Sequence, residues 1–426
     1  MGVPIALTQP TGAPRPGGGC RPGRSEKRGL LGAFGVFGLF WGSWVVVIPD
    51  VQNRAGVGDG ALGLALAAVA VCALPAMPLA GRLVDRHGAH RVLPFALLAF
   101  AAVAALPGLA VGPLSLVLVL AALGAGTGFL DVVVNTATAA WERIEQDRLM
   151  AAAHGTYSLG VLIGSVLTGL ARDAGAGPLA VLGVTGTALA VAGLRQPAYR
   201  RATQDPVVGA GRPAGRRWRI APLLLGLGLV TAMAFLVEDS VQSWSALHLE
   251  RSLAADPWVQ GLGPGLFAGA MAAGRFAVHV VHRPGREAQV VAGGAGVLAA
   301  GVLVLALAPV TWVSLLGMAV AGAGVSVLAP TLFSATGARS APGRQGADLA
   351  LVTTFGYAGF LAGPVVVGLL SSATTLPTAL ALLSGLAVAV AVAGPMLLHR
   401  HPIRADQPGP VDPAGPLAVG GGLPRG

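Results

Sequence analysis

Long apolar runs alternate with short polar segments along most of the chain. Twelve runs reach roughly 17 residues or more, the length an α-helix needs to cross the hydrocarbon core of a bilayer. The pattern therefore predicts an all-α integral membrane protein with twelve transmembrane helices. The expected spans are 30–49, 61–80, 92–110, 114–140, 151–171, 178–194, 221–246, 258–281, 288–308, 312–333, 349–371 and 376–398.

Segments rich in Pro, Gly and Arg flank and divide these runs, at 1–28, 196–219 and 399–426. Such segments bury too little apolar surface to fold, so we expect two disordered cytoplasmic tails and a cytoplasmic linker. The linker would join one six-helix bundle at 29–195 to a second at 220–398. A full spanning segment follows residues 1–28, which favours a tail over a cleaved signal peptide.

The two predicted bundles repeat one another. The dipeptide GR at 81–82 recurs at 274–275, an offset of 193, and GAGTGFLD at 124–131 recurs as GAGVSVLA at 322–329, an offset of 198. A third set recurs at an offset of 199: Gly160, Gly164 and Gly169 match Gly359, Gly363 and Gly368. Nearly equal offsets predict two pseudo-symmetric halves in parallel repeat. The glycines indicate close helix packing.

Composition and charge agree with a membrane protein. Hydrophobic residues make up 54% of the chain and charged residues 11%, against about 25% charged in soluble domains. The mean hydropathy is +0.72. With the N-terminus inside, 25 of the 28 Lys and Arg residues fall on the cytoplasmic side, and only Arg54, Arg172 and Arg251 fall outside. This asymmetry predicts cytoplasmic termini, and it explains the net charge of +10 without nucleic-acid binding.

The chain contains no motif of a soluble or membrane-embedded catalyst. It has no GxSxG, no HExxH and no GKS or GKT, and Cys20 and Cys72 do not form a paired-cysteine site. We therefore expect no enzyme activity, no cofactor, no metal and no ATP hydrolysis. A membrane enzyme or a sensor that does not transport would need a polar catalytic cluster or a soluble domain, and the sequence shows neither.

One charged stretch, GRLVDRHGAHR at 81–91, interrupts the apolar part between the second and third predicted helices. Together with the twelve spans, the two like halves and the basic linker, it resembles the major facilitator superfamily over about residues 30–398. That family's signature at this place is GxLxDRxGxRR. The matching residues are Gly81, Leu83, Asp85, Arg86, Gly88 and Arg91, with His90 in place of one basic residue.

Four further segments resemble a bacterial branch of this family, related to fucose permease and the rhizopine-cluster membrane protein. They are WGSW at 41–44, LDVVVN at 130–135, HGTYSLG at 154–160 and GYAGFLAGP at 356–364. The resemblance implies the fold of that family, with a central cavity between the two bundles.

The resemblance also implies a gate at the charged stretch. Asp85 would face the N-terminus of the eleventh helix, and Arg143 would lie beside it at the end of the fourth. A carboxylate at a helix N-terminus gains about 0.3 to 1 kcal/mol. Such a contact would exist in one arrangement of the halves and favour the outward-open state. A plain positive-inside loop remains an alternative, although it explains the arginines and not the aspartate.

Three acids lie deep in the predicted spans, and burial there is costly enough to indicate function. Asp131 is matched by Ala329 in the repeat, so this position does not require an acid. Asn135 lies one turn on, on the same face, and would order a solute or a water. We expect Asp131 to couple transport to protons. A structural hydrogen bond, for example to His154, is the alternative.

The other two acids, Glu238 and Asp239, are adjacent, and only one can face a central cavity. Glu238 is the preferred candidate because Gln242 lies four residues on, on the same face, although a role at the cavity rim or between helices is an alternative. His154 would either relay protons with Asp131 or make a single polar contact.

Four aromatic residues complete the predicted cavity: Trp41, Trp44, Trp244 and Tyr357. They come from helices that line the cavity in the fold the chain resembles. For Trp44 and Trp244, anchoring at the membrane interface is an equally good interpretation, because tryptophan is enriched there.

These features predict a monomeric secondary active transporter that moves a small organic solute by alternating access.

 A transmembrane proton gradient is the predicted driving force, and the bilayer and the solute are the expected partners. A sugar or polyol symporter that works in uptake is the alternative to an efflux protein. Ser165 stands where export members often carry proline after Gly164, and Gly363-Pro364 occurs only in the eleventh predicted helix. The direction of transport stays open.

Overall fold

The apolar runs form helices at the predicted places. The computed structural model describes residues 24–145, 149–197, 221–281, 285–341 and 344–400. The first half of the chain forms α1 (Arg24–Ala55), α2 (Asp59–His87), α3 (Ala89–Ala104) with the short η1 (Leu106–Leu109), α4 (Pro113–Glu145), α5 (Met150–Asp173) and α6 (Pro178–Leu194). The second half forms α7 (Pro222–Leu253), α8 (Pro257–Val281), α9 (Glu287–Leu307), α10 (Thr311–Val325), α11 (Leu328–Arg339), α12 (Gln345–Ala373) and α13 (Leu376–Arg400).

The predicted span at 312–333 is present, but two helices, α10 and α11, occupy it. The break falls at Ser326, whose hydroxyl donates a hydrogen bond of 2.6 Å to the carbonyl oxygen of Ala323. Serine side chains compete in this way with the backbone bonds of a helix. Both helices still belong to one candidate membrane span, which runs over Thr311–Arg339.

Twelve spans result. Within the described residues, ten helical stretches are long and apolar enough to cross a membrane. The apolar α6 is shorter, at 17 residues, and α8 adds a helix of 25 residues. The first helix begins at Arg24, before the predicted boundary at residue 29. The tails at 1–23 and 401–426 and most of the predicted linker lie outside the described residues.

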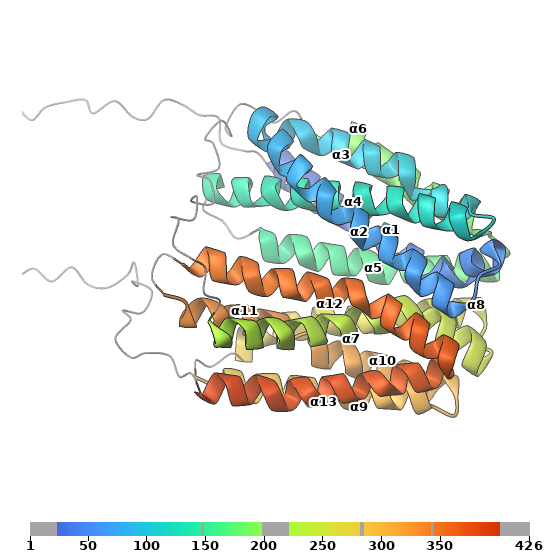
Figure 1. Cartoon of the computed structure of the whole chain (residues 1–426). Coiled ribbons are helices and arrows are strands. Elements are labelled where there is room, and N and C mark those ends of the chain that lie inside the picture. Colours follow the sequence, from blue (N-terminus) through green and yellow to red (C-terminus); the bar gives the residue numbers. More distant parts are fainter. Residues whose placement is uncertain (1–23, 146–148, 198–220, 282–284, 342–343, 401–426) are drawn as a thin grey trace, which may run out of the picture.

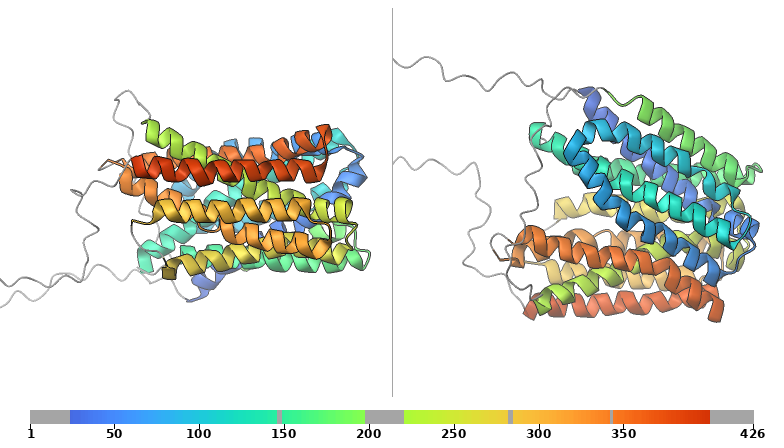
Figure 2. Two further views of the ribbon diagram at one scale, coloured as in Figure 1. Left: turned by 90° about the horizontal axis from the view of Figure 1, so that it is seen from below. Right: turned by 45° about the horizontal axis from the view of Figure 1, so that its top comes forward.

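Equivalent helices form the same packing pairs in the two halves. In the first half α1 packs against α5, α2 against α4 and α3 against α6. In the second half the equivalent pairs are α7 with α12, α8 with α10 and α9 with α13. Figure 1 shows the blue-to-green helices of the first half above the yellow-to-red helices of the second, and the right view of Figure 2 shows the same separation. The predicted pair of pseudo-symmetric six-helix bundles is confirmed.

The bundle has two ends. We call the end at which α1 begins and α13 ends the terminal end, and the opposite end the distal end (Figure 1). The halves meet mainly through α5 with α8 and through α2 with α12.

Two glycines of the sequence repeat lie at these meeting points. A Cβ atom on Gly169 of α5 would be 2.9 Å from the carbonyl oxygen of Trp258 in α8. A Cβ atom on Gly368 of α12 would be 2.6 Å from the carbonyl oxygen of Asp59 in α2. Only glycine allows such close approach, so the repeated glycines bring the backbones of the two halves together near the distal end.

Candidate functional site

Asp131 lies in the middle of α4, and Asn135 holds its carboxylate. The Asn135 side-chain amide donates to the carboxylate oxygen Oδ1 of Asp131 at 3.1 Å and to its backbone oxygen at 2.9 Å. The two residues are four positions apart, as expected for neighbours on one helix face. Asp131 makes no hydrogen bond to His154 within the described residues. The His154 ring packs edge-on against Phe34 instead, with centroids 5.2 Å apart.

Asp131 also faces residues from other helices. Its charge acts on the phenol groups of Tyr157 in α5 and Tyr357 in α12, which belongs to the other half. The charges of Glu238 and Asp239 also act on Tyr157. Tyr157 therefore lies within electrostatic range of all three predicted acids. This residue was part of the HGTYSLG segment, but nothing in the pattern marked its side chain as central.

Glu238 and Asp239 are both buried on α7, at 8% and 9% exposure. Glu238 faces Arg275 of α8, with 3.6 Å between its Oε1 and the guanidinium Nη2. Asp239 makes no ion pair or hydrogen bond within the part of the chain that the structure describes. From the sequence, Arg275 was counted only among the cytoplasmic basic residues, although it falls within the predicted span 258–281. The structure shows that its guanidinium lies beside Glu238 of α7.

Three further predicted residues leave polar or aromatic groups open to a ligand. The Gln242 side chain is half-buried and its amide makes no hydrogen bond to a described residue. Tyr357 is 38% exposed. Trp41 is half-buried and packs edge-on against Phe40, with ring centroids 5.8 Å apart. Gln242 lies one turn from Glu238 on α7 and Tyr357 is within electrostatic range of Asp131, so both offer hydrogen bonds near the acids.

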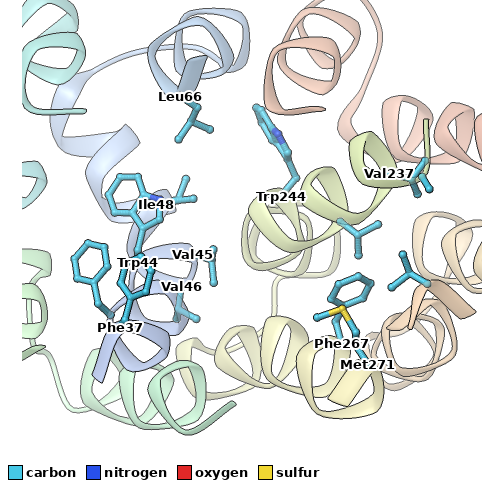
Figure 3. Packing of buried hydrophobic residues seen from close by; sticks show 14 of the residues in the cluster. Phe37, Trp44, Val45, Val46, Ile48, Leu66, Val237, Trp244, Phe267 and Met271 are labelled. Atoms are coloured by element: carbon cyan, nitrogen blue, oxygen red, sulfur yellow. The ribbon is translucent and has the colours of Figure 1, made fainter. Parts of the chain in front are cut away.

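Trp44 and Trp244 are buried inside the bundle, at 2% and 0% exposure. They are related by an offset of 200 and lie on α1 and α7, which are equivalent helices of the two halves. Figure 3 shows Trp44 beside Phe37 and Ile48, and Trp244 on α7 near Leu66. The indole N–H of Trp244 has no acceptor within the described residues. Such burial argues against anchoring at the membrane interface, so a place along the solute path stays the prediction.

Arg172 ties the two halves together at the distal end. Its guanidinium donates two hydrogen bonds to Asp50 of α1, at 2.6 and 2.7 Å, and one of 2.5 Å to Gln260 of α8. A fourth contact, of 3.4 Å, reaches Glu250 of α7. The Arg172 side chain is only 6% exposed. We call these four residues the Arg172 cluster.

A second cluster, centred on Asp59 of α2, joins the halves beside the first. Its carboxylate accepts hydrogen bonds from Arg251 of α7 at 2.5 Å, from Ser371 of α12 at 2.6 Å and from Gln52 of α1 at 2.9 Å. The Arg251 side chain is 36% exposed. We call these four residues the Asp59 cluster. Each cluster contains one residue of α1, one of α7 and one from each helix of a pair that meets between the halves. That pair is α5 with α8 in the Arg172 cluster and α2 with α12 in the Asp59 cluster.

Neither cluster was predicted from the sequence, in which Arg172 and Arg251 stand out only as basic residues on the outer side. One signal was present. Asp50 and Glu250 are acids at an offset of 200, near the ends of equivalent helices. Which arginine each acid would meet depends on helices far apart in the sequence, and the repeat alone does not show that.

The predicted gating stretch lies at the terminal end, where α2 turns into α3. Asp85 is exposed and makes no hydrogen bond or ion pair within the described residues. Gly88 has a φ of 82°, in the region that favours glycine, so its place in the motif follows from the turn. A Cβ atom on Gly81 would meet open space. Arg86 and Arg91 are exposed.

The partners expected for Asp85 do not contact it in this structure. The start of α12 holds its own acid, Asp348, which is 5% exposed and lies 3.1 Å from Arg344. Arg143, near the end of α4, is exposed. A contact between Asp85 and α12 therefore stays a prediction for another arrangement of the halves.

Comparisons with known proteins agree with this architecture. The sequence model of the Major Facilitator Superfamily matches residues 29–302 and 227–421. The chain is 28% identical over 376 residues to an uncharacterized MFS-type transporter of Yersinia pestis, covering 87% of this chain and 95% of that protein. It is also 28% identical over 377 residues to the membrane protein MosC of Rhizobium meliloti, covering 88% of this chain and 90% of that protein.

Solved structures share the fold. The nucleoside transporter NupG superposes with a TM-score of 0.69 at 14% identity, covering 87% of this chain and 99% of that chain. A bacterial homologue of the lysosomal transporter Spinster, in an inward-facing and occupied conformation, superposes with a TM-score of 0.63 at 16% identity, covering 87% and 94% of the two chains.

Proposed function

We propose that this transporter, which belongs to the major facilitator superfamily, moves a small organic solute across the cytoplasmic membrane by proton-coupled alternating access. The observation that carries the proposal is the burial of Glu238 and Asp239 in the middle of α7 and the position of Asp131 in the middle of α4, all within electrostatic range of Tyr157, between two halves whose distal ends are joined. Acids placed at such depth usually serve an ion or solute path. We expect the transporter to act as a monomer.

The closed distal end supports assigning the structure to one particular state of the transport cycle. The Arg172 and Asp59 clusters join the halves at that end, and Trp44 and Trp244 are buried. Arg275 and Tyr357 remain partly accessible near the acids, at 35% and 38% exposure. These features support a conformation in which the site opens toward the terminal end. The distribution of basic residues supports placing that end in the cytoplasm, and the conformation would then be inward-open.

Asp131 is the proposed coupling residue. In an alternating-access cycle it would take up a proton on one side and release it on the other, while the solute changes which state is preferred. Asn135 holds the carboxylate in place, and the charge of Asp131 reaches Tyr357 in the second half. A change of protonation at Asp131 therefore changes the electrostatic environment in both halves.

The test is Asp131→Asn in proteoliposomes, with a solute selected by a thermal-shift screen. We expect loss of accumulation driven by a pH difference, while binding and solute exchange are retained. Asp173→Asn, at an exposed acid at the end of α5, is the matched control. If Asp131→Asn still concentrates solute with wild-type pH dependence, Asp131 is structural and Glu238 becomes the residue to test.

The same assay decides the direction of transport. A symporter, such as one for a sugar or polyol, accumulates solute in the vesicle when the outside is acidic, whereas an efflux antiporter responds to the opposite gradient. Orientation is tested separately with cysteines at Gly58 and His399, which should label from opposite sides of the membrane in cells. Labelling from the same side would contradict the proposed topology.

A further inference from the structure

Arg275 is a cation inside the bundle whose hydrogen-bonding capacity is unused. It lies on α8, six positions before the helix ends at Val281. Among the described residues its only ion-pair partner is Glu238, at 3.6 Å, and it makes no hydrogen bond to any of them. A guanidinium carries five N–H donors. Placing such a group in a membrane protein is costly unless it is paired or serves a ligand.

The surroundings of Arg275 come from both halves. On α7 it faces Glu238, whose side chain is 11% exposed, while 35% of the Arg275 side chain is accessible. From α5, in the other half, His154 and Tyr157 lie within reach of its charge. Because α5 packs against α8, Arg275 lies at the interface between the halves. It is within electrostatic range of two residues of the other half.

The contrast with Arg172 shows what is missing at Arg275. Arg172 is 6% exposed and donates three hydrogen bonds of 2.5 to 2.7 Å, two of them to a single carboxylate. This is the two-pronged geometry in which arginine binds a carboxylate best. Arg275 has the same set of N–H donors but a single, longer contact to Glu238, so part of its guanidinium is available to a ligand.

We propose that Arg275 binds the carboxylate of the solute, and that the transported compound is a small organic acid that also carries hydroxyl groups. The inference rests on the proposed function, because the proton moved with the solute balances the negative charge that the acid brings into the site. Asn135, Gln242 and Tyr357 offer hydrogen bonds to the hydroxyl groups. Glu238 holds Arg275 in the empty site and yields it to the solute.

The experiment measures binding to the purified full chain by isothermal titration calorimetry. The probes are three hydroxylated carboxylates, each with a neutral counterpart: D-glucuronate with D-glucose, lactate with propane-1,2-diol, and malate with butane-1,2,4-triol. We expect at least one carboxylate to bind wild type at least tenfold more tightly than its counterpart. Arg275→Gln should remove that preference and Arg275→Lys should keep part of it. Arg286→Gln, at an exposed arginine between α8 and α9, should bind as wild type does.

Arg275→Gln leaves Glu238 without its partner and can fail to fold. The double variant Arg275→Gln/Glu238→Gln removes both charges and should also lack the preference for carboxylates. Wild type that binds none of the three carboxylates, or variants without Arg275 that keep the preference, would overturn the proposal. Wild type that binds a carboxylate but does not accumulate it under a pH difference contradicts the proposed proton coupling and leaves Arg275 as the anion site. Accumulation of only neutral solutes under a pH difference supports the proposed proton coupling and overturns the assignment of Arg275 as the anion site.

Discussion

The distal clusters and the site around Asp131 use the same residue types in different ways. In the Arg172 cluster, the arginine is almost fully buried and donates hydrogen bonds of 2.5 to 2.7 Å to Asp50 of its own half and to Gln260 of the other half. In the middle of the bundle, Arg275 and Glu238 belong to one half and lie 3.6 Å apart, and Asp239 has no partner within the described residues. Satisfied groups hold a conformation, whereas unsatisfied groups remain available to a ligand or a proton.

The difference has a consequence for the transport cycle. The distal contacts must break each time the halves separate at that end, so their strength sets the population of the distal-open state. The polar groups at the centre make few contacts across the halves, and changing them should alter binding and coupling more than the resting conformation. Three predictions test this separation, from the largest expected effect to the smallest.

Arg172→Gln should give the largest change of conformation. It removes the hydrogen bond to Gln260 and the contact with Glu250, which are the two contacts of Arg172 that cross between the halves. We expect a loss of about 2 kcal/mol, as for a hydrogen bond made by a charged group. The distal-open population should rise by about 30-fold. The measurement is the distance distribution between spin labels at Asn53 and Thr375, by pulsed EPR, with Cys20 and Cys72 replaced by serine.

Arg54→Gln is the matched control for this experiment, since Arg54 is an exposed arginine near the same end of α1. It should leave the distances unchanged. Arg172→Gln with the wild-type distance distribution would show that the cluster does not hold the distal end closed.

Arg251→Gln should act in the same direction with a smaller effect. The Arg251 side chain is 36% exposed, and exposed ion pairs contribute roughly 0.2 to 1 kcal/mol. We therefore expect at most about a fivefold rise in the distal-open population, measured with the same labels. Asp59 keeps its hydrogen bonds from Ser371 and Gln52 in this variant. An effect equal to that of Arg172→Gln would contradict the ranking by burial.

Asp85→Asn should act in the opposite direction and least of all. Asp85 makes no contact in the closed distal state, so its loss costs nothing there, whereas the predicted contact with α12 in the other state would be lost. The expected shift is about 0.3 to 1 kcal/mol toward the distal-closed state. Arg82→Gln, in the same stretch, is the control. An unchanged distribution in Asp85→Asn would leave the stretch as a positive-inside loop.

Much of the site was predictable one helix at a time. Asp131 and Asn135 are four residues apart, and the structure joins them by a hydrogen bond along α4. The repeated glycines indicated close packing, and Gly169 and Gly368 lie where the two halves touch. Tyr157 and Arg275 were not identified as parts of the site, because their neighbours come from helices distant in the sequence.

By itself the sequence determined that this protein lies in a bilayer, where its helices are and that it divides into two like halves. Hydropathy, helical period and repeat offsets are local properties, and backbone hydrogen bonding in a bilayer requires that long apolar runs become helices. Only the tertiary structure decided that Arg172 meets Asp50, 122 positions away, and that Arg275 faces Glu238 with one edge of its guanidinium unused. Charges read from a sequence show where burial is costly, but the partner that offsets the cost is set by the packing of helices against one another.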